Sequence, residues 1–213
     1  VRESILQAGL WPWLVQRPYG ILANPADTPR DIFVSAFDTA PLAADTEFCY
    51  ADEAKAIQAG ATALSKLTSG KVHVSLSADN AHSALARLQN VETHFFKGKH
   101  PAGNVGVQIA NIAPIKKGDI VWTVSLAGLA AIGKLFTKGR YDVRRKVAIC
   151  GPMAIEPAYV LTTPGMPMKD LAPFYGNAPE GLRFVSGNAL SGRNAGADGY
   201  LGFFDNQVTL LKD

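Results

Sequence analysis

The segment HPAGNVG at residues 100–106 combines residue types that could form a ligand-binding loop. Pro101 restricts the entry to the loop, and Gly103 and Gly106 would let the backbone approach a ligand or another chain closely. Amides after Gly103 could bind an anion or a ring carbonyl if a helix begins there, and His100 could donate a hydrogen bond or a proton. A tight strand-to-helix turn with glycines that serve only packing explains the same pattern. Both interpretations stay open, because a glycine motif without GxGxxG spacing is weakly specific.

A second polar segment, DTAPLAAD at residues 38–45, carries the carboxylates Asp38 and Asp45. Paired acids can perform acid–base catalysis. However, Asp38 beside Thr39 is more typical of a residue that pins a turn, and Asp45 fits the N-cap of a following helix. We therefore favour a structural role for this segment.

The histidines and cysteines show no catalytic or metal-binding spacing in the sequence. The histidines are His73, His82, His94 and His100. They match no catalytic triad, nucleophile elbow or metal motif, so we expect no metal site and histidines that are solvated or satisfied by neighbours. Cys49 and Cys150 lie in apolar surroundings without a CxxC pair, which predicts two buried free thiols. Two cysteines are too few for an iron–sulfur cluster held by four thiolates.

Hydrophobic patterning predicts that strands alternate with helices up to about residue 139. Strands are expected at 31–37, 71–77, 91–97 and 119–125. Helices are expected at 2–9, 51–67, 80–88 (with Asn80 as N-cap) and 126–139 (closed by Gly139), with helix or turn after residue 100. Such alternation is typical of βαβ units and a mostly parallel sheet. Ligands of such sheets bind beyond the carboxyl ends of the strands, where the loops at 38–45, 100–106 and 125–128 fall.

The pattern changes after about Arg144. Residues 145–151 and 158–163 predict a hairpin, 168–176 a short helix and 181–187 another strand. This arrangement indicates a small β-grasp-like α+β module. In the last segment, the turn at Asp205 and Asn206 is expected to separate two short strands. The sequence thus predicts units at 1–143 and 144–193, and a segment at 194–213 that leads toward a further region.

Bulk composition excludes several classes of protein. A hydrophobic content of 47% with 18% charged residues is typical of a globular chain rather than a disordered one. The net charge of +3, without a basic stripe, argues against a nucleic-acid partner. No run approaches the roughly 20 apolar residues of a membrane span. The chain starts without Met and stops directly after an apolar run, so we expect a parent that is longer at both ends.

Several segments, in collinear order, resemble one known family. They are GLWPWLVQRPYG, IFVSAFDTAPLAAD, HPAGNVG, FVSGNALSG and YLGFF. Together they are similar to the A subunit of the bacterial Na⁺-translocating NADH:quinone oxidoreductase (Na⁺-NQR) over nearly the whole chain. The resemblance implies a Rossmann-like α/β domain over 1–143, related to the FMN-binding domain of the complex I flavin subunit. It also implies a β-grasp module of the SLBB (soluble-ligand-binding β-grasp) type over 144–193, and further regions before Val1 and after Asp213.

The positions at which the complex I relatives contact flavin differ in this chain. Their Gly-rich flavin loop corresponds to RPYGILANP at 17–25, which has only Gly20. Their acid–Cys–acid segment is replaced by one with Asp38 and Ala40, and their Asn-x-x-Thr corresponds to residues 125–128. The resemblance therefore implies no tightly bound cofactor here. It places the FAD, FMN, iron–sulfur and NADH sites on other subunits.

The resemblance also implies a peripheral subunit on the cytoplasmic side of the bacterial inner membrane. Its complex oxidises NADH, reduces ubiquinone or menaquinone to the quinol, and pumps Na⁺ out of the cell. The expected partners are the other subunits of the complex, especially the flavin-carrying membrane subunit, and quinone. We expect this chain to be non-catalytic alone and to contribute subunit docking and quinone binding.

If a quinone headgroup binds here, the loops at the strand ends are the expected contact. His100 would donate to a quinone carbonyl, Gly103 and Gly106 would allow close approach of the ring, and Asp38 would orient neighbouring amides. Two alternatives remain beside this hypothesis. One is a stand-alone FMN-binding electron-transfer domain, and the other is a purely structural assembly module.

Overall fold

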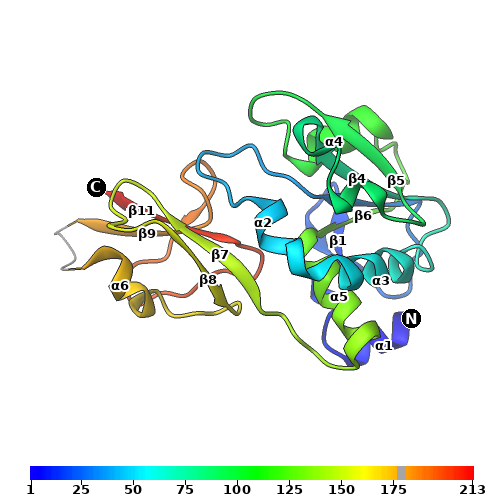
Figure 1. Ribbon diagram of the computed structural model, residues 1–213. Helices are drawn as coiled ribbons and strands as arrows, with labels where there is room; N and C mark the ends of the chain where they lie inside the picture. Colours follow the sequence, from blue (N-terminus) through cyan, green and yellow to red (C-terminus); the bar gives the residue numbers. More distant parts are fainter. Residues whose placement is uncertain (177–180) are drawn as a thin grey trace. The chain divides into compact units, whose positions relative to one another are not determined.

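The computed structural model describes residues 1–176 and 181–213. These residues form two compact units, each with its own sheet (Figure 1). The first unit comprises Val1–Thr39 and Thr46–Asp142, and the second comprises Ala40–Asp45 and Val143–Asp213. The chain is therefore of the α/β class, as its patterning predicts. Most of the DTAPLAAD segment belongs to the second unit, although it directly follows a strand of the first.

The first unit is built on a six-stranded sheet of described residues, in the order β2-β1-β6-β3-β4-β5. The strands are β1 (Val15–Arg17), β2 (Ile21–Leu22), β3 (Asp31–Ser35), β4 (Val72–Ser77), β5 (Glu92–Phe96) and β6 (Val121–Ser125). β6, β3, β4 and β5 run parallel, and β1 pairs antiparallel with β6 and β2. The order reverses beside β3, because the chain passes back from β5 to β6. Such reversals are where open α/β sheets bind ligands.

Helices cover both faces of this sheet (Figure 1). They are α1 (Arg2–Gln7), η1 (Trp11–Trp13), α2 (Thr46–Tyr50), η2 (Ala51–Glu53), α3 (Ala54–Leu64), α4 (Val105–Ile112) and α5 (Leu126–Lys138). α3 and α5 pack so closely that a Cβ on Gly133 would lie 1.6 Å from the Ala56 carbonyl oxygen. On the opposite face, Phe33 and Val121 pack against Ile109 of α4. α5 ends at Gly139, whose φ of 65° is the left-handed conformation that favours glycine.

The helix predicted at 80–88 is wrong. The structure has two short 3₁₀ turns there instead, η3 (Ala78–Asn80) and η4 (Ala84–Arg87). Ser77 and Ser83 are the N-caps, and their hydroxyls accept hydrogen bonds from the amides two residues later. Serine side chains that bind nearby amides in this way compete with a continuous helix, and only Leu85 of the two turns is buried.

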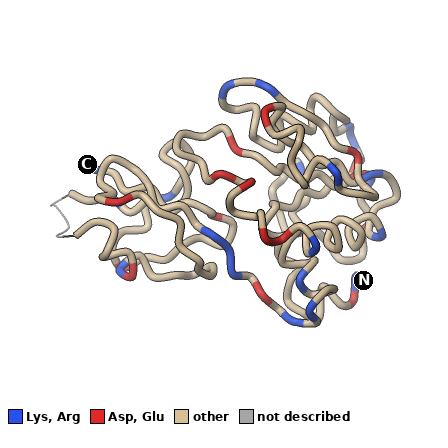
Figure 2. Tube along the Cα trace, in the orientation of Figure 1, with Lys and Arg blue, Asp and Glu red and all other residues tan. Residues whose placement is uncertain are grey.

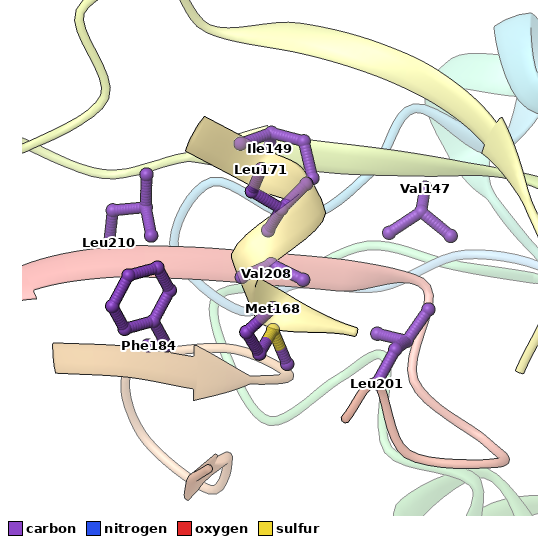
Figure 3. Packing of buried hydrophobic residues seen from close by; sticks show 8 residues of the cluster. All are labelled: Val147, Ile149, Met168, Leu171, Phe184, Leu201, Val208 and Leu210. Carbon is purple, nitrogen blue, oxygen red and sulfur yellow. The ribbon is translucent and has the colours of Figure 1, made fainter. Parts of the chain in front are cut away.

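The second unit contains a five-stranded sheet of described residues, in the order β10-β9-β11-β7-β8. Its elements are β7 (Arg145–Cys150), β8 (Ala158–Thr162), η5 (Met168–Leu171), α6 (Ala172–Tyr175), β9 (Leu182–Ser186), β10 (Arg193–Asn194) and β11 (Gln207–Lys212). β11 runs parallel to β7 and antiparallel to β9. Figure 3 shows its dry core, formed by Val147, Ile149, Met168, Leu171, Phe184, Leu201, Val208 and Leu210.

The C-terminal segment differs from its expected arrangement. Residues 207–212 form a strand inside the second sheet, whereas residues 201–206 form no strand. The buried Arg145 guanidinium explains the second difference, because it donates to the carbonyl oxygens of Gly202, Phe203 and Asp205. These carbonyl groups are thereby satisfied without a neighbouring strand.

The thiols and the charges follow the sequence-based expectations. Cys49 and Cys150 are buried and free. Burial raises the pKa of the Cys150 thiol, against a smaller opposite effect of hydrogen bonds with Thr209 and Gln207. Lys and Arg alternate with Asp and Glu along the chain and form no continuous run (Figure 2). Among residues 1–176 and 181–213, no helix has both the length and the apolar character needed to cross a membrane.

Candidate functional site

The HPAGNVG loop lies against the chain that leaves β3, at the carboxyl end of the parallel strands. The amide of Gly103 donates to Thr39 Oγ1 over 3.0 Å. A Cβ on Gly103 would lie 2.7 Å from the Thr39 amide nitrogen and 2.9 Å from Asp38 Cα. No side chain fits there without a backbone shift, so glycine is required by close packing. The sequence-predicted residues Gly103 and Asp38 are therefore in contact.

A buried polar network holds this loop from beneath. Gln108 of α4 is fully buried, and its Nε2 donates to Ser35 Oγ over 2.9 Å and to the Gly103 carbonyl over 3.2 Å. Ser35 Oγ in turn lies 3.0 Å from the same carbonyl oxygen and donates to it. Gln108 Oε1 has no hydrogen-bond partner among the described residues. The end of β3 and the first turns of α4 thus fix the position of the loop.

The loop presents hydrogen-bond donors on its exposed side. His100 is exposed, with its Nδ1 3.3 Å from Thr39 Oγ1. The amide of Gly103 is bound by Thr39, which takes the orienting role that the sequence analysis gives to Asp38. In contrast, the amides of Val105 and Gly106, the first residues of α4, have no acceptor within the described residues. Such amides at a helix start attract carbonyl oxygens and anions.

Arg17 is a neighbour that the sequence analysis misses. It ends β1, which pairs with β6 so that Arg17 faces Val121 in register. A Cβ on Gly106 would lie 3.3 Å from Arg17 Nη2. The Arg17 side chain makes no ion pair or hydrogen bond with any described residue. Positive charge and helix amides thus meet at Gly106, a combination that suits a carbonyl oxygen or an anion. No local motif marks Arg17, because strand pairing alone brings it to the loop.

A second cluster lies on the α4 face of the same sheet, where β4 meets the edge strand β5. His73 is paired with Glu92 in register, and Ser75 with His94. His73 Nδ1 lies 2.9 Å from His94 Nε2 and 3.6 Å from Glu92 Oε2. His73 is buried, His94 half-buried and Glu92 exposed. Spacing along the sequence does not indicate this cluster, because its members come from two strands.

The surroundings of His73 hold its ring in place. Phe33 stacks on the ring, with centroids 4.6 Å apart, and Asp31 Oδ1 lies 3.5 Å from its Nε2. Burial lowers the pKa of His73, and the nearby Asp31 carboxylate opposes this effect only in part. For Asp31, burial raises the pKa, but hydrogen bonds from the Lys71 amide and Arg30 outweigh it and lower the pKa overall.

The fold and the loop together define an α/β domain with a candidate binding site at the strand ends. The chain belongs to the NqrA family, the A subunits of the Na⁺-translocating NADH-quinone reductases: residues 1–141 match the family model described as the NqrA second alpha/beta domain. Relatives that bear this name are 40% identical in Yersinia pestis bv. Antiqua (over 215 residues) and 38% identical in Pseudomonas aeruginosa (over 214 residues). Each match covers 100% of this chain and 47% of the relative. A third, from Saccharophagus degradans, is 38% identical and covers 98% of this chain and 46% of the relative. The chain thus spans about half the length of the curated relatives it matches.

Proposed function

We propose that this chain is part of the A subunit of a Na⁺-translocating NADH:quinone oxidoreductase and that its strand-end loop contacts the quinone headgroup. Family membership supports the identity of the complex. In this proposal the subunit is peripheral, lies on the cytoplasmic side of the inner membrane, and docks on the other subunits, especially the flavin-carrying membrane subunit. The complex reduces ubiquinone or menaquinone with NADH and pumps Na⁺ outward, whereas this chain catalyses no step by itself.

We also propose finer fold assignments for the two units. In the first unit, the parallel order β5-β4-β3-β6 with a reversal beside β3 supports a Rossmann-like domain. In the second, a hairpin, a short helix and two more strands form a mixed sheet in which β7 and β11 run parallel. This arrangement supports a β-grasp module of the SLBB type.

The observation that carries the quinone proposal is the set of donors around Gly106. A quinone has two carbonyl oxygens on a flat ring, and it needs donors for the oxygens and open space for the ring. The amides of Val105 and Gly106 and the Arg17 guanidinium provide donors that no described residue occupies. His100 provides a titratable donor on the same loop.

We propose that no flavin is tightly bound in this chain. The counterpart of the Gly-rich flavin loop of the complex I relatives is the turn of the β1–β2 hairpin. Gly20 has a φ of 68° there, and its amide donates to the Gln16 carbonyl oxygen over 2.9 Å. A hairpin turn explains this glycine without a phosphate or flavin ligand. Absorbance of the purified chain tests the point, because a flavin band near one equivalent would favour the electron-transfer alternative.

Steady-state kinetics of the assembled complex test the quinone contact. Arg17→Gln and His100→Ala in the full-length subunit should each raise the KM for quinone by roughly 5-fold, which corresponds to one hydrogen bond of about 1 kcal/mol. NADH oxidation with an artificial acceptor should be unchanged. His82→Ala, an exposed histidine outside the loop, is the matched control. Unchanged quinone kinetics in both loop variants would leave the purely structural assembly module as the better description.

A further inference from the structure

The cluster on β4 and β5 brings together three side chains that ligate transition metals. Side chains two residues apart on a strand share a face, so the parallel register places those of His73, Glu92 and His94 together. One ligand atom from each of these residues can be chosen so that all three lie within 4.8 Å of one another. Zinc–nitrogen bonds are about 2.0–2.1 Å long. An ion between the two rings therefore requires side-chain rotation but no change of strand register.

The carboxylate behind His73 matches the usual support of a metal-bound histidine. Such a histidine almost always donates its other ring N–H to a carboxylate or carbonyl, which fixes the tautomer and the ring. Asp31 Oδ1 lies 3.5 Å from His73 Nε2, while Nδ1 faces His94 and Glu92. Asp31 itself accepts from the Lys71 amide over 3.1 Å and from Arg30 Nε over 2.7 Å. His73 Nδ1 is thereby left with its lone pair directed at the cluster.

The remaining contacts leave one side of the cluster open. Glu92 is exposed on the edge strand and pairs with Lys71 Nζ through its other oxygen, at 3.3 Å. Ser75 lies opposite His94 in register, and its buried hydroxyl has no partner within residues 1–176 and 181–213. A metal-bound water could use this hydroxyl as a hydrogen-bond partner. Solvent could therefore reach the fourth coordination position from the side of Glu92.

We propose that His73, Glu92 and His94 form a three-ligand site for a divalent transition-metal ion of the Zn²⁺ class. Two imidazole nitrogens and one carboxylate oxygen suit Zn²⁺ and its neighbours, whereas Mg²⁺ and Ca²⁺ prefer oxygen ligands alone. The ion replaces the single proton that two neutral imidazoles share at 2.9 Å. Its structural effect is to fasten the edge strand β5 to β4, directly before the HPAGNVG loop leaves β5. The site is independent of the proposed quinone contact.

Titration of the purified, chelator-treated chain with Co²⁺ and then Zn²⁺ tests this site. We expect one equivalent of Co²⁺ to give the visible absorption of a four-coordinate ion, and Zn²⁺ to displace it. His94→Ala should abolish this signal, and Glu92→Gln should weaken binding at least 10-fold. Both residues lie outside the buried core, so the variants should fold, which circular dichroism checks. His73, which is buried, is left unchanged for this reason.

The two exposed histidines outside the cluster provide the controls. His82→Ala and His100→Ala should leave the stoichiometry and affinity of Co²⁺ unchanged. The site is overturned if the unaltered chain binds no saturable equivalent of Co²⁺ or Zn²⁺. It is equally overturned if folded His94→Ala binds as tightly as the unaltered chain, or if His82→Ala removes binding to the same extent.

Discussion

The strand-end loop and the histidine cluster belong to the same sheet, yet they are built in opposite ways. The loop depends on backbone: Gly103 packs against residues 38–39, and helix amides provide donors. The cluster depends on side chains that strand register brings together from β4 and β5. The loop residues are nearly contiguous, whereas His73 and His94 are not. Close backbone packing makes a site sensitive to any added atom, while a half-exposed side-chain cluster tolerates change more easily.

The largest expected effect separates the two glycines of the loop. Gly103→Ala should lower the free energy of unfolding by about 2 kcal/mol, because the new Cβ would overlap backbone atoms. Gly106→Ala should change it by less than about 0.5 kcal/mol, since only the flexible end of Arg17 is near and alanine favours the helix. Urea denaturation followed by tryptophan fluorescence measures this, because Trp11, Trp13 and Trp122 all lie in the first unit. Equal losses would contradict the packing role of Gly103.

The next effect concerns the network under the loop. Gln108→Leu should destabilise the first unit by about 1–3 kcal/mol, because it removes the donor to Ser35 and to buried loop carbonyls. Asn111→Ala on the exposed side of the same helix is the control and should be close to neutral. The same fluorescence measurement applies. A loss of similar size in both variants would point to helix propensity instead of the network.

A smaller effect distinguishes two serines that face each other in register on β3 and β4. Ser35→Ala should cost about 1 kcal/mol, since its hydroxyl accepts from Gln108 and donates to the Gly103 carbonyl. Ser75→Ala should be neutral or slightly stabilising in metal-free buffer, because its buried hydroxyl has no partner among the described residues. A clear loss in the second variant would show that the cluster already depends on this hydroxyl without metal.

The smallest expected effect lies in the cluster itself. His94→Ala should cost less than about 1 kcal/mol in the presence of a chelator, because the ring is only half-buried. With Zn²⁺ in excess the difference from the unaltered chain should grow, since only the unaltered chain gains stability from metal binding. Thermal unfolding with and without Zn²⁺ measures both values. If Zn²⁺ leaves the difference unchanged, the contrast between the two regions is limited to packing.

Local patterns predict much of the first unit. The strands at β3, β4, β5 and β6 and the helix α5 lie where hydrophobic periodicity places them, and Gly139 ends α5 as expected. The contact of Gly103 with Asp38 follows from the rule that strand-end loops gather at one edge of a parallel sheet. The misplaced helix at 80–88 reflects serine capping, which local periodicity does not weigh.

The sequence by itself determined the α/β class, the family and the loop at residues 100–106, because each depends on contiguous residues. Only the tertiary structure decided that Arg17 lies beside Gly106, that Thr39 binds the Gly103 amide, and that His73 meets Glu92 and His94. It also decided that β11 lies inside the second sheet. These outcomes depend on which strands pair and in which register. Pairing is set by the burial of whole faces, so no short segment contains that information.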